Sequence, residues 1–200
     1  MYMGDVKSKT FLDTNASSAT YVAAAAQPTS TFTLANSSFG TNTARKITAT
    51  TAGTGDNGKT VTIVGKDHNN EDATEVITLT GSAETSSGTT TAFLSITSAT
   101  VSAQPAANVS LGMTADVFGS VFQGRTRVRQ VNAESGGAIG SVLFRNGSLT
   151  GTALLTVRTG GTAGDINTVN IPQDGILYKD GAFVTFDETQ CNSATVYFDG

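Results

Sequence analysis

Residues 59–79 read KTVTIVGKDHNNEDATEVITL, which is two apolar-rich runs separated by a polar segment. In the first run Val61 and Ile63 alternate with polar residues, so a strand would place both on one face. The second run alternates in a similar way. The intervening Gly65–Asp72 is rich in the turn-forming residues Gly, Asp and Asn. This pattern predicts an antiparallel β-hairpin with a long polar tip.

Short apolar runs of the same kind lie on both sides of this hairpin, separated by Ser, Gly and Asn clusters at the spacing typical of sandwiches and barrels. The strands expected in the first half of the chain are Thr31–Leu34, Arg45–Thr50, Lys59–Val64, Ala73–Thr80, Ala92–Ser102 and Asn108–Leu111. Those expected in the second half are Thr126–Val131, Gly140–Arg145, Ala153–Thr159, Thr168–Ile171, Gly175–Tyr178, Ala182–Phe186 and Ala194–Phe198.

The runs predict an all-β fold: two small antiparallel β-sandwich or barrel-like domains preceded by an extended N-terminal arm. The arm is residues 1–30, which are small and polar and show no sustained strand alternation and no capped helix. The first β domain is expected over 31–113 and the second over 114–200. The joint between them is expected near Gly112–Gly119.

The composition is poor in charge. Charged residues make up 14% of the 200 residues, apolar residues 38%, and about one residue in six is threonine. Disorder usually combines low hydrophobicity with high net charge, whereas the net charge here is −4 and the apolar residues cluster, which favours a folded chain. Hydroxyl-rich, charge-poor faces cost little to desolvate. They fit a component of an assembly, and they would also fit an extracellular adhesin.

Composition also limits the partners. A pI near 4.8 disfavours binding to nucleic acid, and no apolar run is long enough to cross a membrane. The opening residues Met1–Asp5 lack the basic and apolar regions of a signal peptide. The single cysteine, Cys191, cannot form an internal disulfide, which favours synthesis in a reducing cytosol.

Residues for catalysis or metal binding are few. His68 is the only histidine, and it falls in the hairpin tip, where water would be hard to exclude. One His and one Cys cannot form a zinc site. Oxygen ligands for calcium are present in Asp67, Asn69, Glu71 and Asp72, but the loop lacks the EF-hand spacing, so a solvated tip is favoured. We therefore expect no catalytic, cofactor-binding or metal-binding residues, and no enzyme.

Two further groups of side chains stand out. The aromatic residues near the C-terminus are expected to form the core of the second domain: Tyr178, Phe183, Phe186, Tyr197 and Phe198. Arg125, Arg127 and Arg129 recur every second position, so a strand would place all three on one face. Like charges in a row are unfavourable unless they stay in water or meet carboxylates. The strip is therefore either a solvated face or a subunit-contact strip for an acidic neighbour.

The hairpin segments Val61–Asp67 and Ala73–Leu79 resemble a hairpin of the virion proteins of tailed bacteriophages, in which a strand ending in Gly-x-Asp is followed by a polar tip and a returning Thr-Glu strand. Residues 91–98 and 109–112 are similar to its continuation. Residues 174–184 resemble the close of small β-sandwich phage structural proteins. The resemblance implies a non-enzymatic virion component that decorates or cements a capsid, or that lies on the neck or tail. It assigns a role to no individual residue.

The function that we expect is therefore that of a capsid decoration or cement protein, which stabilises the head shell through arm and β-domain contacts. Its expected partners are other virion proteins, such as the major capsid protein, and further copies of itself. It would be made in the host bacterial cytoplasm and reside in the virion. The alternatives are a tail, neck, baseplate or fibre component that contacts a host surface glycan and, from another class, a hydrolase of cell-wall or capsule polymers.

Overall fold

A computed structural model describes residues 5–13, 15–51, 53–80, 88–172 and 174–200. Those residues form fourteen β-strands and one short 3-10 turn, η1 (Thr54–Asp56), and no α-helix. The all-β fold expected from the sequence is confirmed. No helix of the described residues has the length and apolar character needed to cross a membrane.

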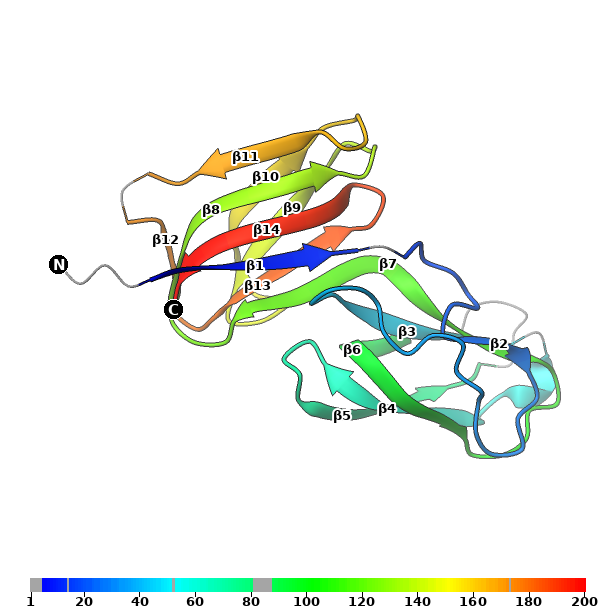
Figure 1. Ribbon diagram of the computed structural model, residues 1–200. Coiled ribbons are helices and arrows are strands. Elements are labelled where there is room, and N and C mark those ends of the chain that lie inside the picture. Colours follow the sequence, from blue (N-terminus) through cyan, green and yellow to red (C-terminus); the bar gives the residue numbers. More distant parts are fainter. Residues whose placement is uncertain (1–4, 14, 52, 81–87, 173) are drawn as a thin grey trace. The chain divides into compact units, whose positions relative to one another are not determined.

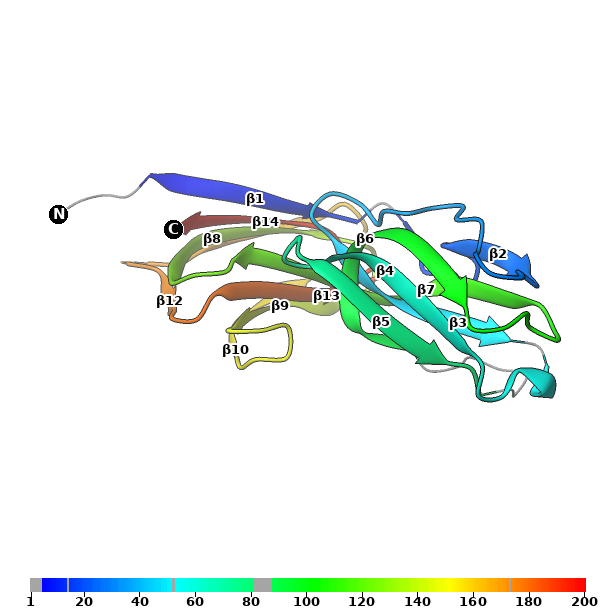
Figure 2. The ribbon, with the colours of Figure 1, turned by 90° about the horizontal axis from the view of Figure 1, so that it is seen from below.

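The hairpin expected over residues 59–79 is formed by β4 (Thr60–Asp67) and β5 (Asp72–Thr78). The two strands pair antiparallel from Thr60↔Thr78 to Lys66↔Asp72, so the tip is shorter than predicted (Figure 2). The Asp67 carboxylate closes the turn by accepting the backbone N–H groups of Asn69 and Glu71 at 2.8 and 2.9 Å. This local bond pattern is typical of aspartate at a turn.

The chain divides into two compact units. We name the first the hairpin unit, which comprises residues 15–39 and 44–115. It contains β2 (Ala23–Ala26), β3 (Ala44–Thr51), β4, β5, β6 (Gly88–Val101) and the first half of β7 (Val109–Phe122). Its strands lie in the order β7-β3-β6-β4-β5, and β2 pairs with β7. Its core combines sheet residues such as Ile63 and Phe93 with Phe32 and Phe39 from the preceding segment.

The second, which we name the sandwich unit, comprises the described residues of 1–14, 40–43 and 116–200. One of its sheets has the order β1-β14-β8-β11, with β12 also on β8, and the other has the order β10-β9-β13-β7 (Figure 1). Side chains of both sheets form one buried cluster, as in a β-sandwich. Its strands are β1 (Val6–Leu12), the second half of β7, β8 (Thr126–Ser135), β9 (Gly140–Asn146), β10 (Ala153–Thr159), β11 (Ile166–Asn170), β12 (Ile176–Tyr178), β13 (Ala182–Asp187) and β14 (Cys191–Asp199).

The described part of the expected N-terminal arm is not an arm. Residues 6–12 form β1, which pairs with β14 of the same chain from Val6↔Asp199 to Leu12↔Ser193. Phe11 is fully buried in the sandwich unit, and Val22 is fully buried in the hairpin unit. Burial of these two side chains and the β1 ladder tie the segment to its own chain. Residues 1–4 of the expected arm and of the opening segment lie outside the described residues.

Two other expectations differ from the structure. Thr31–Leu34 forms no strand, because it meets β6 only through the isolated bridge Thr31↔Thr100, while the Phe32 side chain turns into the core. The expected joint near Gly112–Gly119 contains the boundary between the units, which falls between Ala115 and Asp116 within the continuous strand β7, but the expected division into two sequential domains differs from the structure. The units are also discontinuous in sequence, since residues 40–43 belong to the sandwich unit.

A glycine makes room for the N-terminal segment of the hairpin unit. A Cβ atom on Gly112 would lie 2.3 Å from the Ser18 carbonyl oxygen and 2.6 Å from Ala19 Cα. The segment is bonded at this point, because the Met113 N–H donates to that same Ser18 oxygen at 3.1 Å. Any side chain at position 112 therefore has to displace backbone.

We expect Gly112→Ala to lower the free energy of unfolding by about 2 kcal/mol, which is typical of overpacking. Chemical denaturation measures this loss. Gly160→Ala is the matched control, because the nearest atom to a Cβ there is a flexible Asp165 carboxylate oxygen at 3.7 Å. Equal stability of the two variants would contradict the close packing of residues 18–19 on β7.

Candidate subunit-contact site

The three arginines of the predicted strip lie at the start of β8 and just before it. Thr126 and Val128 are buried, whereas Arg127 and Arg129 are half-buried on the opposite face, as alternation requires. Arg125 precedes the strand and is exposed. The three side chains therefore occupy different environments.

Arg129 is engaged within its own chain. Its Nη2 and Nε lie 2.5 and 2.7 Å from Asp199 Oδ2, on the neighbouring strand β14. The hydrogen bond that Arg129 donates to Asp199 is the main cause of a raised pKa for Arg129. Arg129 thus has the carboxylate that the strip was expected to find on a neighbouring subunit, and we exclude it from the candidate contact.

Arg125 and Arg127 line a surface hollow of about 270 Å³, which we name the arginine hollow. Its other lining residues are Thr126, Leu177, Asp199 and Gly200. Arg127 Nη1 donates to the Asp174 carbonyl oxygen at 3.3 Å, which orients the guanidinium but leaves its charge unneutralised. Among the described residues, neither Arg125 nor Arg127 forms an ion pair within 4 Å. The two guanidinium groups can bind a carboxylate through paired, charge-assisted hydrogen bonds.

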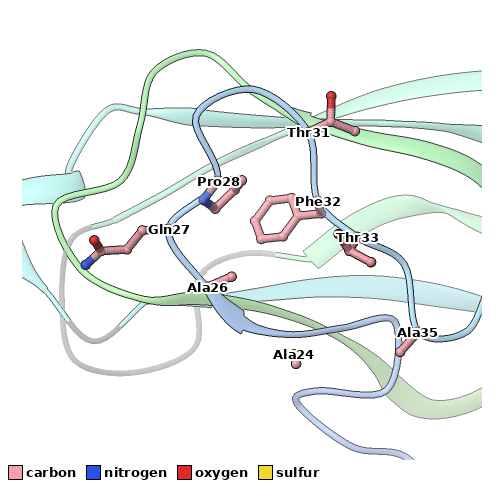
Figure 3. A pocket seen from close by; sticks show the side chains of 8 residues that line it. All are labelled: Ala24, Ala26, Gln27, Pro28, Thr31, Phe32, Thr33 and Ala35. Atoms are coloured by element: carbon pink, nitrogen blue, oxygen red, sulfur yellow. The ribbon is translucent and has the colours of Figure 1, made fainter.

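A second hollow, of about 370 Å³, lies in the hairpin unit beside β2. Its lining is mostly apolar, with Gln27, Thr31 and Thr33 as the polar members, and Figure 3 shows the Phe32 ring among the residues around it. The lining residues are Ala24, Ala26, Gln27, Pro28, Thr31, Phe32, Thr33 and Ala35. The sequence did not reveal this feature, because four of its residues belong to the segment expected to be an arm and three others to the expected strand Thr31–Leu34. Its chemistry suits an apolar side chain.

The hairpin tip is more closed than the sequence suggested. The His68 side chain is only 17% exposed, and its Nδ1 lies 3.9 Å from Asp67 Oδ2. Burial lowers the pKa of His68, and the carboxylates of Asp67 and Glu71 partly offset this, so the imidazole is neutral at pH 7.

Two of the four side chains considered for calcium have other roles at the tip. Asp67 Oδ1 braces the turn, and Asp72 pairs with Lys66 Nζ at 2.9 Å. In the parts of the chain that the structure describes, no three His, Cys, Asp or Glu side chains are grouped as metal ligands would be. The arrangement at the tip is that of a braced turn.

Cys191 and the C-terminal aromatic residues lie in the sandwich unit. Cys191 is fully buried at the start of β14, and burial raises the pKa of its thiol to about 12. The thiol is therefore protonated and inert at neutral pH. Of the five aromatic residues expected in the core, Tyr197 is half-buried. The other four are buried: Tyr178, Phe183, Phe186 and Phe198.

Two buried charges went unrecognised in the sequence. Arg45 and Asp56 are both fully buried in the hairpin unit. Arg45 donates to backbone carbonyls, and Asp56 accepts from backbone N–H groups, a hydroxyl and Lys59. The three printed bonds of Arg45, and two of the four of Asp56, are to backbone far away in the sequence, so both side chains hold loops in place.

No family model, no curated protein and no solved structure matches this chain. Its class therefore rests on the fold and on the surface features described above. They define an all-β, charge-poor chain of two compact units, with a small cationic hollow on one of them.

Proposed function

We propose that this chain is a structural protein of a tailed-bacteriophage virion, and specifically a decoration or cement protein of the head shell. The arginine hollow is the observation that carries the proposal. It leaves two cations, Arg125 and Arg127, without a carboxylate partner among the described residues, on a chain in which only 14% of residues are charged. A neighbouring subunit that supplies a carboxylate would complete the site. The hairpin resemblance to virion proteins supports the same assignment.

The mechanism is additive. Each copy buries modest hydroxyl-rich area and one charge-assisted contact, and symmetry repeats these contacts over the shell. Binding that requires the assembled shell stabilises that shell by mass action. Residues 6–12 pair with β14 of the same chain. The contacts with the shell therefore come from the surfaces of the two units and not from a free arm.

Charge reversal tests the arginine hollow. We expect Arg125→Glu/Arg127→Glu to weaken binding to shells that lack the protein by at least about tenfold, because truncation or reversal at a desolvated charge pair costs several kcal/mol. Co-sedimentation with such shells measures the change. Both side chains contact solvent, so the thermal unfolding of the purified variant should match that of the unmodified protein.

The matched control is Lys66→Glu/Lys179→Glu, which alters the net charge equally. Lys179 is exposed, and the pair between Lys66 and Asp72 lies at the surface. We expect this control to bind like the unmodified protein. Unchanged binding of the Arg125/Arg127 variant would show that the hollow is not a subunit contact.

The function itself is tested on particles. Particles produced without this protein are expected to release their genome at lower temperature, and on milder chelation, than intact particles. Adding back the purified protein should restore the resistance. Equal resistance of the two kinds of particle would exclude cementing.

A further inference from the structure

The strand orders β10-β9-β13-β7 and β7-β3-β6-β4-β5 share β7 and form one sheet, so the described residues contain two sheets. Four strands end these sheets, β1, β5, β10 and β11, and the short strands β2 and β12 pair at their sides. Exposed strand edges promote pairing between chains, and proteins usually block them with charges, prolines or bulges. β1 carries Lys7 and Lys9, and β5 carries Asp72 and Glu75. β10 has a register shift between Ala153 and Leu155 and also carries Arg158. Three of the four edges are therefore protected.

β11 has none of these protections. Its five residues are Ile-Asn-Thr-Val-Asn, without charge or proline, and its pairing with β8 contains no register shift. Ile166, at its start, is 67% exposed. Figure 1 shows β11 at the end of its sheet, beyond β8. An uncharged, regular edge of this kind is suited to accept another strand.

The direction of the backbone groups follows from the bonds at the two ends of β11. The Ser135 N–H donates to Asp165 O at 2.8 Å, and the Ile171 N–H donates to Arg129 O at 3.0 Å. Bonds in an antiparallel ladder alternate, so the groups of residues 167 and 169 also point to β8. The backbone N–H and C=O groups of Ile166, Thr168 and Asn170 point away from β8, and no other described backbone group bonds to these N–H and C=O groups.

The side chains of β11 also leave this edge open. Val169 packs against the buried cluster of the sandwich unit, and Asn167 Nδ2 donates to the Arg158 carbonyl oxygen at 2.7 Å. These two side chains hold the inner face. Ile166, Thr168 and Asn170 are exposed on the other face.

We propose that β11 pairs antiparallel with β11 of a second copy of this chain, about a two-fold axis at Thr168. In this register Thr168 lies opposite Thr168 of the second copy. Ile166 lies opposite Asn170 of the second copy, and Asn170 lies opposite Ile166 of the second copy. All three outward-pointing residues are then in hydrogen-bonded pairs, which makes six backbone bonds. The strand is neutral throughout, so no like charges oppose one another.

A second copy is the occupant that the edge itself specifies. A strand that pairs with itself about a two-fold axis must be self-complementary. In the β11 pair, each outward-pointing N–H group of one copy lies opposite an outward-pointing C=O group of the other. The end strands β1, β5 and β10 of a second copy carry charges or a bulge, β2 has a register shift, and β12 has only three residues. β11 is therefore the longest unprotected edge that a second copy offers in return. The contact is distinct from the arginine hollow, and it holds whether or not the protein belongs to a virion.

A five-residue strand pair is small, so the free dimer is expected to be weak and to be reinforced where many copies are held together. Sedimentation equilibrium over a range of protein concentrations measures it. We expect Thr168→Lys and Thr168→Glu each to remain monomeric at concentrations where the unmodified chain dimerises, because like charges then face each other across the axis. An equimolar mixture of the two variants should dimerise again, because opposite charges then face each other.

Thr168→Val is the matched control and should dimerise like the unmodified chain, since it keeps the backbone N–H and adds no charge. Thermal unfolding of all variants checks that the fold is intact, and residue 168 is exposed. Dimerisation of either charged variant alone would overturn the proposal, as would a mixture that remains monomeric. A monomeric unmodified chain at the highest concentration would overturn it too. Binding of the same variants to shells is measured separately. A loss of shell binding therefore tests only the proposed virion function and not the β11 dimer.

Discussion

Arg45→Ala is expected to lower the free energy of unfolding by about 4 kcal/mol. Arg45 is the largest fully buried side chain of the described residues. Its Nη1 donates to the carbonyl oxygens of Thr114 and Ala115, both at 2.7 Å, and its Nη2 donates to that of Asn15 at 3.1 Å. Truncation leaves these carbonyls without their donor and opens a cavity around them.

Chemical denaturation of the purified chain measures the loss. Arg45→Lys should recover only part of it, because an ammonium group cannot reproduce the fork that reaches three carbonyls. Lys66→Ala is the control: it removes a surface ion pair in the same unit and should change stability by no more than about 0.5 kcal/mol. If Arg45→Ala were as stable as Lys66→Ala, the buried fork would have no structural role.

Asp56→Ala is expected to lower the free energy of unfolding by about 3 kcal/mol. The buried carboxylate accepts from Thr51 Oγ1 at 2.9 Å and from Lys59 Nζ at 3.0 Å. It also accepts the backbone N–H groups of Ala106 at 2.5 Å and Ala107 at 3.2 Å. Alanine leaves buried donors unsatisfied at the point where β3, η1 and the loop after β6 meet.

The same carboxylate gives stability a defined pH dependence. Burial alone would raise the pKa of Asp56, but the hydrogen bonds from Ala106, Lys59, Thr51 and Ala107 lower it from 3.8 to about 2. A group whose pKa is lower in the folded state stabilises the fold above its unfolded pKa, and this contribution is lost as pH falls through the folded pKa. The loss is therefore expected between about pH 4 and pH 2.

Denaturation at several pH values, with Asp56→Ala and Asp72→Ala compared, tests both points. Asp72 is 92% exposed and its replacement should have little effect. The stability of Asp56→Ala should fall less between pH 4 and pH 2 than that of Asp72→Ala. Parallel pH profiles for the two variants would contradict the assigned role of Asp56.

Alternating apolar residues predicted most of the strands. Val61 and Ile63 are fully buried on one face of β4, as their two-residue spacing required, and nearly every expected strand overlaps an observed one. Periodicity is a local property, and the sequence shows it directly.

Long-range pairing was the part that periodicity could not reveal. β1 pairs with β14 at the other end of the chain, so its residues looked like a polar arm. Arg129 and its partner Asp199 are separated by 70 positions, and Asp56 bonds to backbone 50 and 51 positions away. No spacing rule connects such residues. The uncharged edge of β11 was also hidden, because the strand order that makes it an edge is a property of the fold.

The central claim, that this chain is a shell component of a virion, is tested most directly by counting its copies in purified particles. Quantitative mass spectrometry, calibrated against the major capsid protein, gives the number per particle. A decoration protein that follows the shell symmetry should be present in on the order of hundreds of copies. A dozen or fewer would place it on the neck or baseplate and contradict shell decoration. Absence from the particles would contradict the virion assignment altogether.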